Sequence, residues 1–345
     1  MKTARIFFTV AITSAFGGFC QEALSPLEPT LAYKKMRLKN GNQYIGETEV
    51  GLPSGIGSII SDDGKTTTGY FQDGTYIGDF IVSPPWHLID IEYYLDTVYD
   101  FKRFSIDLEI LTPIPDDSYL YIAPFGSSKL NEIPFYGGIQ THCGGYEEAD
   151  HHEKNLPFRE LGRAMIFSRW EERKGAAILK APGGVCESSG YEGDFISVRN
   201  ALKWGVGKYT FTLAKTNKTI EINDTLHTFV EMTVYDHLQR KTFFCGSLAF
   251  PGERLMLDDQ QFIFVELYAK RLHIKHVPYA KFQFSSFKVN GNPISIPFSA
   301  ALYDKNYPKY AGATFSNNAF TIEIGKPIYS PIQTAEEVYF EVLEE

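Results

Sequence analysis

The stretch Phe104-Ser-Ile-Asp-Leu-Glu-Ile110 alternates apolar and polar side chains over seven positions. Such alternation is typical of a β-strand with one buried face, because successive side chains point to opposite sides of a sheet. Similar short segments recur on both sides of it, at 119–123, 164–168, 208–213, 228–234, 262–267 and 320–324. Helical periodicity is nearly absent. Many short strands between turn signals predict an all-β chain built as an antiparallel β-sandwich.

The composition supports this fold class and restricts the ligands. The 345 residues include 27 Phe and 21 Tyr, and aromatic side chains pack well on pleated sheets. The formal net charge is −9, which disfavours nucleic acid and anionic membranes as partners. Neutral ligands such as sugars are not disfavoured.

The N-terminus has the three-part pattern of a secretory signal peptide over residues 1–20. Lys2 and Arg5 precede an apolar run at 6–16, and Gly17-Gly18 begins a small-residue region. Cleavage is expected near Cys20 or Ala23. An uncleaved anchor and acylation of Cys20 are the alternatives, although the run is shorter than the ~20 residues of a membrane span. The chain is therefore expected to be exported, either secreted to the extracellular space or held in the cell envelope, with no membrane span in its mature part.

Paired glycines recur at a period near 23 residues between positions 41 and 80. Gly69 and Gly74 follow Gly46 and Gly51 at this spacing, and the tripeptide Tyr44-Ile-Gly46 recurs as Tyr76-Ile-Gly78. This spacing is typical of stacked β-hairpins, in which glycine supplies the positive φ angles of tight turns.

This glycine pattern resembles the MORN (membrane occupation and recognition nexus) repeat, of which one and a half to two copies are visible. The resemblance implies a ladder of hairpins over residues 24–83 that serves as a spacer, as a contact surface for a protein partner through residues 41–80, or as a lipid-contact surface. The alternative is that the hairpins only cap the core of the next domain. Pro84-Pro85 blocks strand continuation, so a second domain is expected over residues 86–345.

Four motifs follow in order within the second domain: Phe135-Tyr-Gly-Gly-Ile-Gln140, Phe167-Ser-Arg-Trp170, Gly190-Tyr-Glu-Gly193 and a strand beginning Trp204-Gly-Val-Gly207. Together they resemble a family of secreted proteins defined only as a domain of unknown function, over roughly residues 87–330. Two departures are the double glycine after Tyr136 and Arg169-Trp170-Glu171 in place of a Trp-Asp pair. The resemblance implies a lectin-like jelly roll, an association with polysaccharide-handling proteins and no established reaction.

The same motifs supply the chemistry of a sugar site. Proteins bind sugars through aromatic faces and through planar polar groups that form paired hydrogen bonds with neighbouring hydroxyls. The candidate ligand-binding residues are Gln140, Arg169, Trp170, Tyr191, Glu192 and Trp204. The alternative for the two tryptophans is burial in the core of the sandwich.

Metal sites and disulfides are weakly indicated. His142, Cys143, His151 and His152 have zinc-ligand types without a known spacing, and no metal site is assigned. Calcium is a candidate cofactor at the acidic cluster formed by Glu147, Glu148, Asp150 and Glu153. Among the remaining cysteines, Cys143 and Cys186 are the candidate disulfide pair, and three buried free thiols with Cys245 are the equal alternative.

Three functions remain open at this point. The leading interpretation is a secreted, non-catalytic carbohydrate-binding or adhesion module whose partner is a glycan or polysaccharide. The second is a hydrolase or lyase that acts on a polysaccharide, with Glu171 and Glu192 as its carboxylates. The third is a structural envelope or matrix protein that binds another protein through the hairpins.

Overall fold

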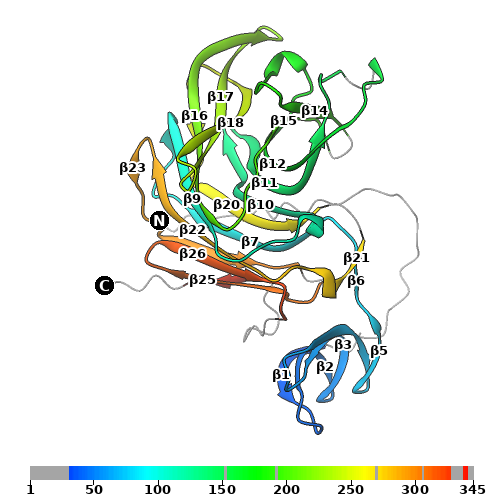
Figure 1. The fold of residues 1–345 in the computed structure, drawn as a ribbon. Helices are drawn as coiled ribbons and strands as arrows, with labels where there is room; N and C mark the ends of the chain where they lie inside the picture. The colour runs from blue at the N-terminus through cyan, green and yellow to red at the C-terminus, as the bar shows by residue number, and fades with distance from the viewer. Residues whose placement is uncertain are drawn as a thin grey trace, which may run out of the picture. The chain divides into compact units, whose positions relative to one another are not determined.

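The computed structural model describes residues 31–150, 154–190, 193–268, 271–304, 307–327 and 337–340. These residues form β-strands and three short 3₁₀ helices, and every strand pairing among them is antiparallel. The strands belong to a small N-terminal sheet, two large sheets and a separate two-stranded pair (Figure 1). The predicted all-β fold is confirmed.

The N-terminal sheet, called here the hairpin sheet, contains five strands of the described chain in sequence order. They are β1 (Ala32–Arg37), β2 (Gln43–Glu49), β3 (Leu52–Ile60), β4 (Thr66–Gln72) and β5 (Thr75–Asp79). Each strand pairs with the next through a short turn. The expected ladder of hairpins is therefore present over this segment.

Glycine and tyrosine fit together inside the hairpin sheet. The ring of Tyr44 lies against the backbone of Gly57, where an added Cβ would come within 2.2 Å of the Tyr44 hydroxyl. That hydroxyl donates a hydrogen bond of 2.6 Å to the carbonyl oxygen of Glu47. Tyr76 lies in the same way against Gly69. Each glycine thus makes room for a tyrosine from a neighbouring strand.

The first large sheet has eleven strands in the described chain. In spatial order they are β14 (Val185–Ser189), β15 (Phe195–Ala201), β12 (Arg159–Trp170), β11 (Ile133–Gly145), β10 (Leu120–Leu130), β20 (Gln260–Leu267), β7 (Trp86–Tyr94), β24 (Phe298–Leu302) and β27 (Glu337–Tyr339), with β19 (Met256–Leu257) and β8 (Tyr99–Asp100) joined beside β10.

The second large sheet has nine strands in the described chain. They are β13 (Ile178–Lys180), β18 (Lys241–Pro251), β17 (Thr225–Asp236), β16 (Gly207–Ile222), β9 (Arg103–Ile110), β22 (Ala280–Val289), β26 (Ala319–Ile324) and β25 (Ala311–Ser316), with β23 (Asn292–Pro293) beside β22. β6 (Ile81–Val82) pairs separately with β21 (Leu272–His273). The 3₁₀ helices are η1 (Asp116–Ser118), η2 (Gly175–Ala177) and η3 (Ile274–His276).

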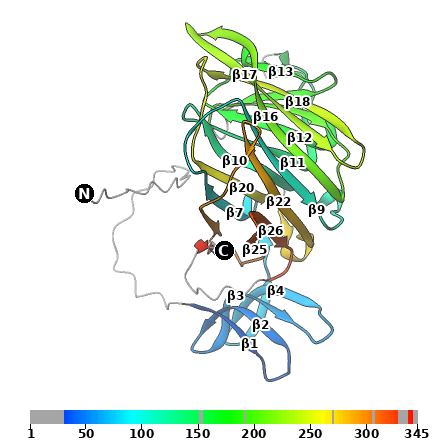
Figure 2. The same cartoon turned by 90° about the vertical axis from the view of Figure 1, so that its left-hand side faces the viewer.

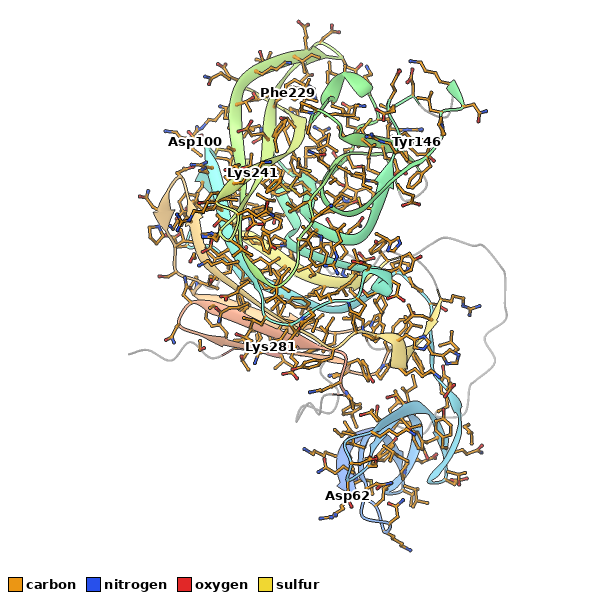
Figure 3. All side chains as sticks on the ribbon, viewed as in Figure 1. Asp62, Asp100, Tyr146, Phe229, Lys241 and Lys281 are labelled. Carbon is orange, nitrogen blue, oxygen red and sulfur yellow. The ribbon has the colours of Figure 1, made fainter. Side chains whose placement is uncertain are left out.

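The two large sheets lie face to face and enclose one hydrophobic core (Figures 1 and 2). Strand β9 shows how the sequence produces it: Phe104, Ile106, Leu108 and Ile110 are all buried, as the alternation predicts. Phe229, labelled in Figure 3, is another of the buried side chains that fill the space between the sheets. The predicted antiparallel sandwich is confirmed.

Within the described ranges, no helix has the length and apolar character needed to cross a membrane.

Candidate functional site

The face of the eleven-stranded sheet that points away from the core, called here the outer face, carries a second apolar cluster. Its members are separate from the main core, and they are Tyr121, Ala123, Ile166 and Phe264, with Tyr136 and Tyr268 packed against them. Their neighbours along each strand point into the sandwich, as alternation requires. The first four are buried and only Tyr136 and Tyr268 are half-buried, so these two rings are the part of the cluster that a ligand can reach.

Strand register places three polar side chains in one row across this face. Tyr121 on β10 lies directly opposite Gln140 on β11 and opposite Glu266 on β20. Neighbouring strands are about 4.8 Å apart, so Glu266 and Gln140 flank the phenol ring from either side. Gln140, predicted as a ligand-binding residue, does lie on the outer face.

A β-bulge in β7 brings His87 and Asp90 to the same face. The register against β20 shifts between Val265 and Glu266, so that Glu266 faces His87 and Phe264 faces Asp90. His87 Nδ1 lies 2.7 Å from Asp90 Oδ1, and the two rings of His87 and Phe264 are 4.9 Å apart. Bulges often re-aim side chains next to active sites.

The imidazole of His87 is cationic at neutral pH. Desolvation by burial disfavours its charged form, but the nearby carboxylates outweigh that effect and raise its pKa to about 9. Asp90 contributes most, through its charge and its hydrogen bond, and Glu266 and Asp304 add to it. An imidazolium therefore stands between two carboxylates on the outer face.

Asp90 and Glu266 form a carboxylate pair. They occupy diagonal positions on neighbouring strands, and such positions lie about 7–8 Å apart. The side chain of Asp90 remains partly exposed, and so does Glu266. Side chains at such positions can bring their carboxyl groups to the roughly 5–10 Å separation at which two carboxyl groups flank a glycosidic bond.

Buried hydroxyl groups lie under the same face. The hydroxyls of Tyr121, Ser168 and Ser197 are buried and have no hydrogen-bond partner in the described part of the chain. Burial raises the pKa of Tyr121 well above its usual value, with smaller effects from Tyr136 and Glu266. Tyr121 therefore keeps its proton and remains a hydrogen-bond donor at all physiological pH values.

Two half-buried aromatic rings lie beside these hydroxyls. Tyr136 and Trp170 come from neighbouring strands β11 and β12, and their ring centroids are 5.9 Å apart. Gly193 lies alongside, where an added Cβ would be 3.6 Å from the Trp170 ring. Three of the quoted motifs thus meet on the outer face, and Trp170 lies among them.

An ion pair lies at the end of the outer face that is formed by β14 and β15. Arg199 on β15 bonds to the Glu187 carboxylate on β14, and both side chains are mostly buried. Desolvation opposes the charge on Arg199, but Glu187 outweighs it and raises the pKa of the guanidinium. Arg199 also donates a hydrogen bond of 2.5 Å to the carbonyl oxygen of Gly144. This pair holds β14 and β15 against the end of β11.

Two predicted ligand-binding residues lie in the interior instead. Trp204 is 2% exposed; its indole nitrogen donates to the Gln140 carbonyl oxygen at 3.2 Å, and the Arg163 guanidinium lies 4.2 Å above its ring. Arg169 is buried against Phe250. Both side chains were expected to contact a ligand. Both predictions are wrong, because each side chain packs inside the sandwich.

The remaining predicted ligand-binding residues, Tyr191 and Glu192, lie outside the described residues. Glu171, the other carboxylate of the earlier hydrolase pair, is exposed in the turn after β12, where its φ is 61°. Its backbone N–H donates a hydrogen bond of 2.7 Å to the carbonyl oxygen of Asp194.

The metal candidates have other partners. His142 directs Nδ1 to the Asp116 carbonyl oxygen at 2.8 Å and stacks on Tyr119, while Cys143 is buried. His151, His152 and Glu153 lie outside the described residues. Among the side chains that are described, no group of three or more metal-ligand types is arranged to hold an ion.

The acidic loop at residues 147–150 borders a cleft of about 920 Å³, close to Tyr146 in Figure 3. Glu147 pairs with Arg159 at 3.0 Å and with Lys180 at 3.2 Å. Glu148 and Asp150 both pair with Lys154. Because these carboxylates already have cationic partners, the loop does not match the open oxygen cage that calcium requires.

The three described cysteines are free. Cys143, Cys186 and Cys245 are all buried, and the candidate disulfide between the first two is wrong. Burial is the main reason that the pKa of Cys143 and that of Cys186 rise to about 11. The thiols are therefore packing groups.

The sequence analysis missed His87, Asp90 and Glu266. Residues three apart in a regular strand point to opposite faces, so no spacing rule joins His87 to Asp90. Glu266 did carry a signal, because it is the one acidic residue of Phe262-Ile-Phe-Val-Glu-Leu267 and has the same alternation as Phe262 and Phe264.

No protein-family model matches the chain, and no curated protein matches it. The solved structures that are similar to it include two peptidases. One is SCP-B, a member of the eqolisin family of peptidases, in complex with the tripeptide Ala-Ile-His, with a TM-score of 0.31 and 9% identity over 70% of this chain and 98% of the other. The second is scytalido-glutamic peptidase with a peptide-based transition-state analogue, with a TM-score of 0.30 and 8% identity over the same shares.

These findings correct the leading interpretation of the sequence. The two peptidase structures have TM-scores near 0.3, so they carry no reaction over to this chain. Trp204 and Arg169, two of the residues on which a non-catalytic carbohydrate-binding or adhesion module rested, are interior groups. That interpretation is wrong.

Proposed function

We propose that this chain is a hydrolase that cleaves a neutral polysaccharide on the outer face of the eleven-stranded sheet. The observation that carries the proposal is the carboxylate pair Asp90 and Glu266, brought to one face by the bulge in β7. Two carboxyl groups on one face of a sheet suit the hydrolysis of a glycosidic bond.

The two carboxyl groups have different surroundings, which suggests their roles. Asp90 accepts a hydrogen bond from the cationic His87 and is the base that takes a proton from the attacking water. Glu266 acts as the acid in the molecules in which it is protonated, and it then gives that proton to the leaving sugar oxygen. The water oxygen forms the new bond to the anomeric carbon as the glycosidic bond breaks, so atoms and charge balance.

The surroundings of the pair favour a neutral sugar polymer as substrate. The half-buried rings of Tyr136 and Trp170 offer apolar surface to sugar C–H groups, and Gln140 offers an amide fork. Asp90, Glu266 and the overall charge of −9 repel anionic polymers. An extended face across several strands suits a chain-like substrate.

The test is release of reducing ends from soluble starch, xylan, mannan and mixed-linkage β-glucan. Asp90→Asn and Glu266→Gln should each lower kcat about 10²–10⁴-fold on the polymer that the wild type cleaves. Glu221→Gln, at an exposed carboxylate on β16 of the other large sheet, is the matched control and should keep full activity. Unchanged kcat in both site variants, or cleavage of a protein in place of every polysaccharide, would refute the proposal.

We propose a second function for the hairpin sheet, as a contact surface for a protein partner. It exposes several large apolar side chains, among them Val50, Leu52 and Ile77, and such patches are typical of interaction sites. The test is chemical cross-linking in the native exported fraction with the full chain and with Leu52→Ser/Ile77→Ser. A discrete partner seen with the wild type and lost in the variant supports the contact; identical cross-links with both proteins contradict it.

A further inference from the structure

Three aromatic side chains form an exposed ladder on the outer face, near the β27 edge of the eleven-stranded sheet. Tyr94, Phe298 and Tyr339 come from the adjacent strands β7, β24 and β27. The ring centroids are 5.6 Å apart from Tyr94 to Phe298 and 5.5 Å apart from Phe298 to Tyr339. Phe298 is 40% exposed and Tyr339 is 57% exposed. This aromatic ladder has no role in the core.

The aromatic ladder shares its face with the carboxylate pair. Asp90, Glu92 and Tyr94 alternate along β7 and therefore point to the same side, and Phe298 lies directly opposite Tyr94. Tyr94 is four positions after Asp90, which corresponds to about 13 Å along a strand. A chain-like ligand that crosses Asp90 along this strand reaches the ladder.

Polar groups around the rings indicate the chemistry of the occupant. Tyr94 donates a hydrogen bond of 2.9 Å to Glu92, which also accepts from the Gln260 amide. Tyr339 is hydrogen-bonded to Glu337 in the same way. The rings match the apolar C–H side of a sugar, and the carboxylates and the amide beside them match its hydroxyl groups. The negative charge of these carboxylates disfavours an anionic lipid surface or an anionic polymer.

We infer that the aromatic ladder is a distal subsite that binds a neutral polysaccharide chain beyond the point of cleavage. This inference rests on the proposed hydrolase function and extends it, because it assigns the enzyme a preference for long chains. Binding energy from such a remote part of the substrate improves kcat/KM for a polymer and has no effect on an oligosaccharide too short to reach.

The experiment compares the wild type with Phe298→Ser/Tyr339→Ser on the polysaccharide that the wild type cleaves and on a tetrasaccharide prepared from it. The polymer kcat/KM should fall about tenfold or more in the variant, and the tetrasaccharide kcat/KM should stay the same. Leu238→Ser, which changes an 82% exposed apolar side chain in the turn between β17 and β18, is the control and should change neither value. Circular dichroism and sedimentation accompany each variant.

The outcomes separate the inference from the proposed function. Unchanged polymer kinetics in the double variant overturn the subsite and leave the hydrolase standing. An equal loss on polymer and tetrasaccharide also overturns it, because the residues would then act on the cleavage step. A change from dimer to monomer with unchanged kinetics identifies the ladder as a self-association surface instead. A wild type that cleaves none of the polysaccharides overturns the proposed function itself.

Discussion

His87 and Asp90 are hydrogen-bonded at 2.7 Å on one face of the sheet, although a regular strand would point them to opposite faces. The extra residue of the bulge at the β7–β20 register shift makes the contact. Because Asp90 also belongs to the proposed catalytic pair, the protonation of His87 affects both the stability of this face and its chemistry.

The first prediction concerns pH. The pKa of His87 rises from 6.5 to about 9 on folding, so its contribution to stability is fully present below pH 6.5 and is lost as the pH rises through about 9. Urea unfolding of the wild type and of His87→Gln should differ most at pH 6 and progressively less toward pH 9.5. His276→Gln, at an exposed histidine, is the control. A difference that grows with pH contradicts the assignment.

The second prediction separates two tryptophans that look alike in sequence. Trp204→Ala removes a ring in the core and should cost about 3–5 kcal/mol of unfolding free energy. Trp170→Ala removes a half-buried ring from the outer face and should cost clearly less, while raising KM for the polymer. Denaturant unfolding and steady-state kinetics provide both readouts. Equal destabilisation by the two substitutions would mean that Trp170 is also a core residue.

The sequence predicts much of the fold because alternation is a local property. The strand at 104–110 has its four apolar side chains in the core, and the glycine spacing at 41–80 locates real hairpins. The candidate site was harder to predict from the sequence. Gln140 and Trp170 were found through motifs, but Arg169 was misplaced because residue type alone does not tell which side of a strand faces the core. Trp204 was misplaced because it lies in the connection before β16 and not in the strand that the motif predicts. His87 and Asp90 were missed because a bulge leaves no signal in residue spacing.

The third prediction tests the fit of glycine and tyrosine in the hairpin sheet. Gly57→Ala places a methyl group within 2.2–2.5 Å of the Tyr44 ring and should destabilise the sheet by about 1–3 kcal/mol. Gly78→Ala is the matched control, because an added Cβ there meets no atom within 4 Å. Hydrogen exchange of the β2, β3 and β4 amides measures both. Equal protection in the two variants would show that the ring moves aside without cost.

The fourth prediction concerns the thiols. Cys143, Cys186 and Cys245 should resist alkylation by iodoacetamide at pH 8 in the native protein, since burial raises the pKa of each thiol and blocks access to it. In denaturant all three should react quickly, and peptide mapping by mass spectrometry identifies each site. A Cys143–Cys186 peptide that remains joined under non-reducing conditions contradicts the free-thiol state.

The fifth prediction concerns the buried guanidinium of Arg169. It donates to the carbonyl oxygens of Trp170, Glu171 and Ala249 and lies 5.2 Å from the Phe250 ring centroid. Burial lowers its pKa to about 10, which shows that the charge is costly to hold there.

Arg169→Ala should therefore destabilise the protein by about 3–5 kcal/mol, because three carbonyl groups lose their donor and a cavity opens beside Phe250. Arg169→Lys should recover only part of the loss, since an ammonium does not reproduce the planar fork. Denaturant unfolding at pH 7 measures both variants, and Arg173→Ala, at an exposed arginine close by, is the control. If Arg169→Ala instead kept the wild-type stability and raised KM for the polymer, the side chain would be a ligand contact after all.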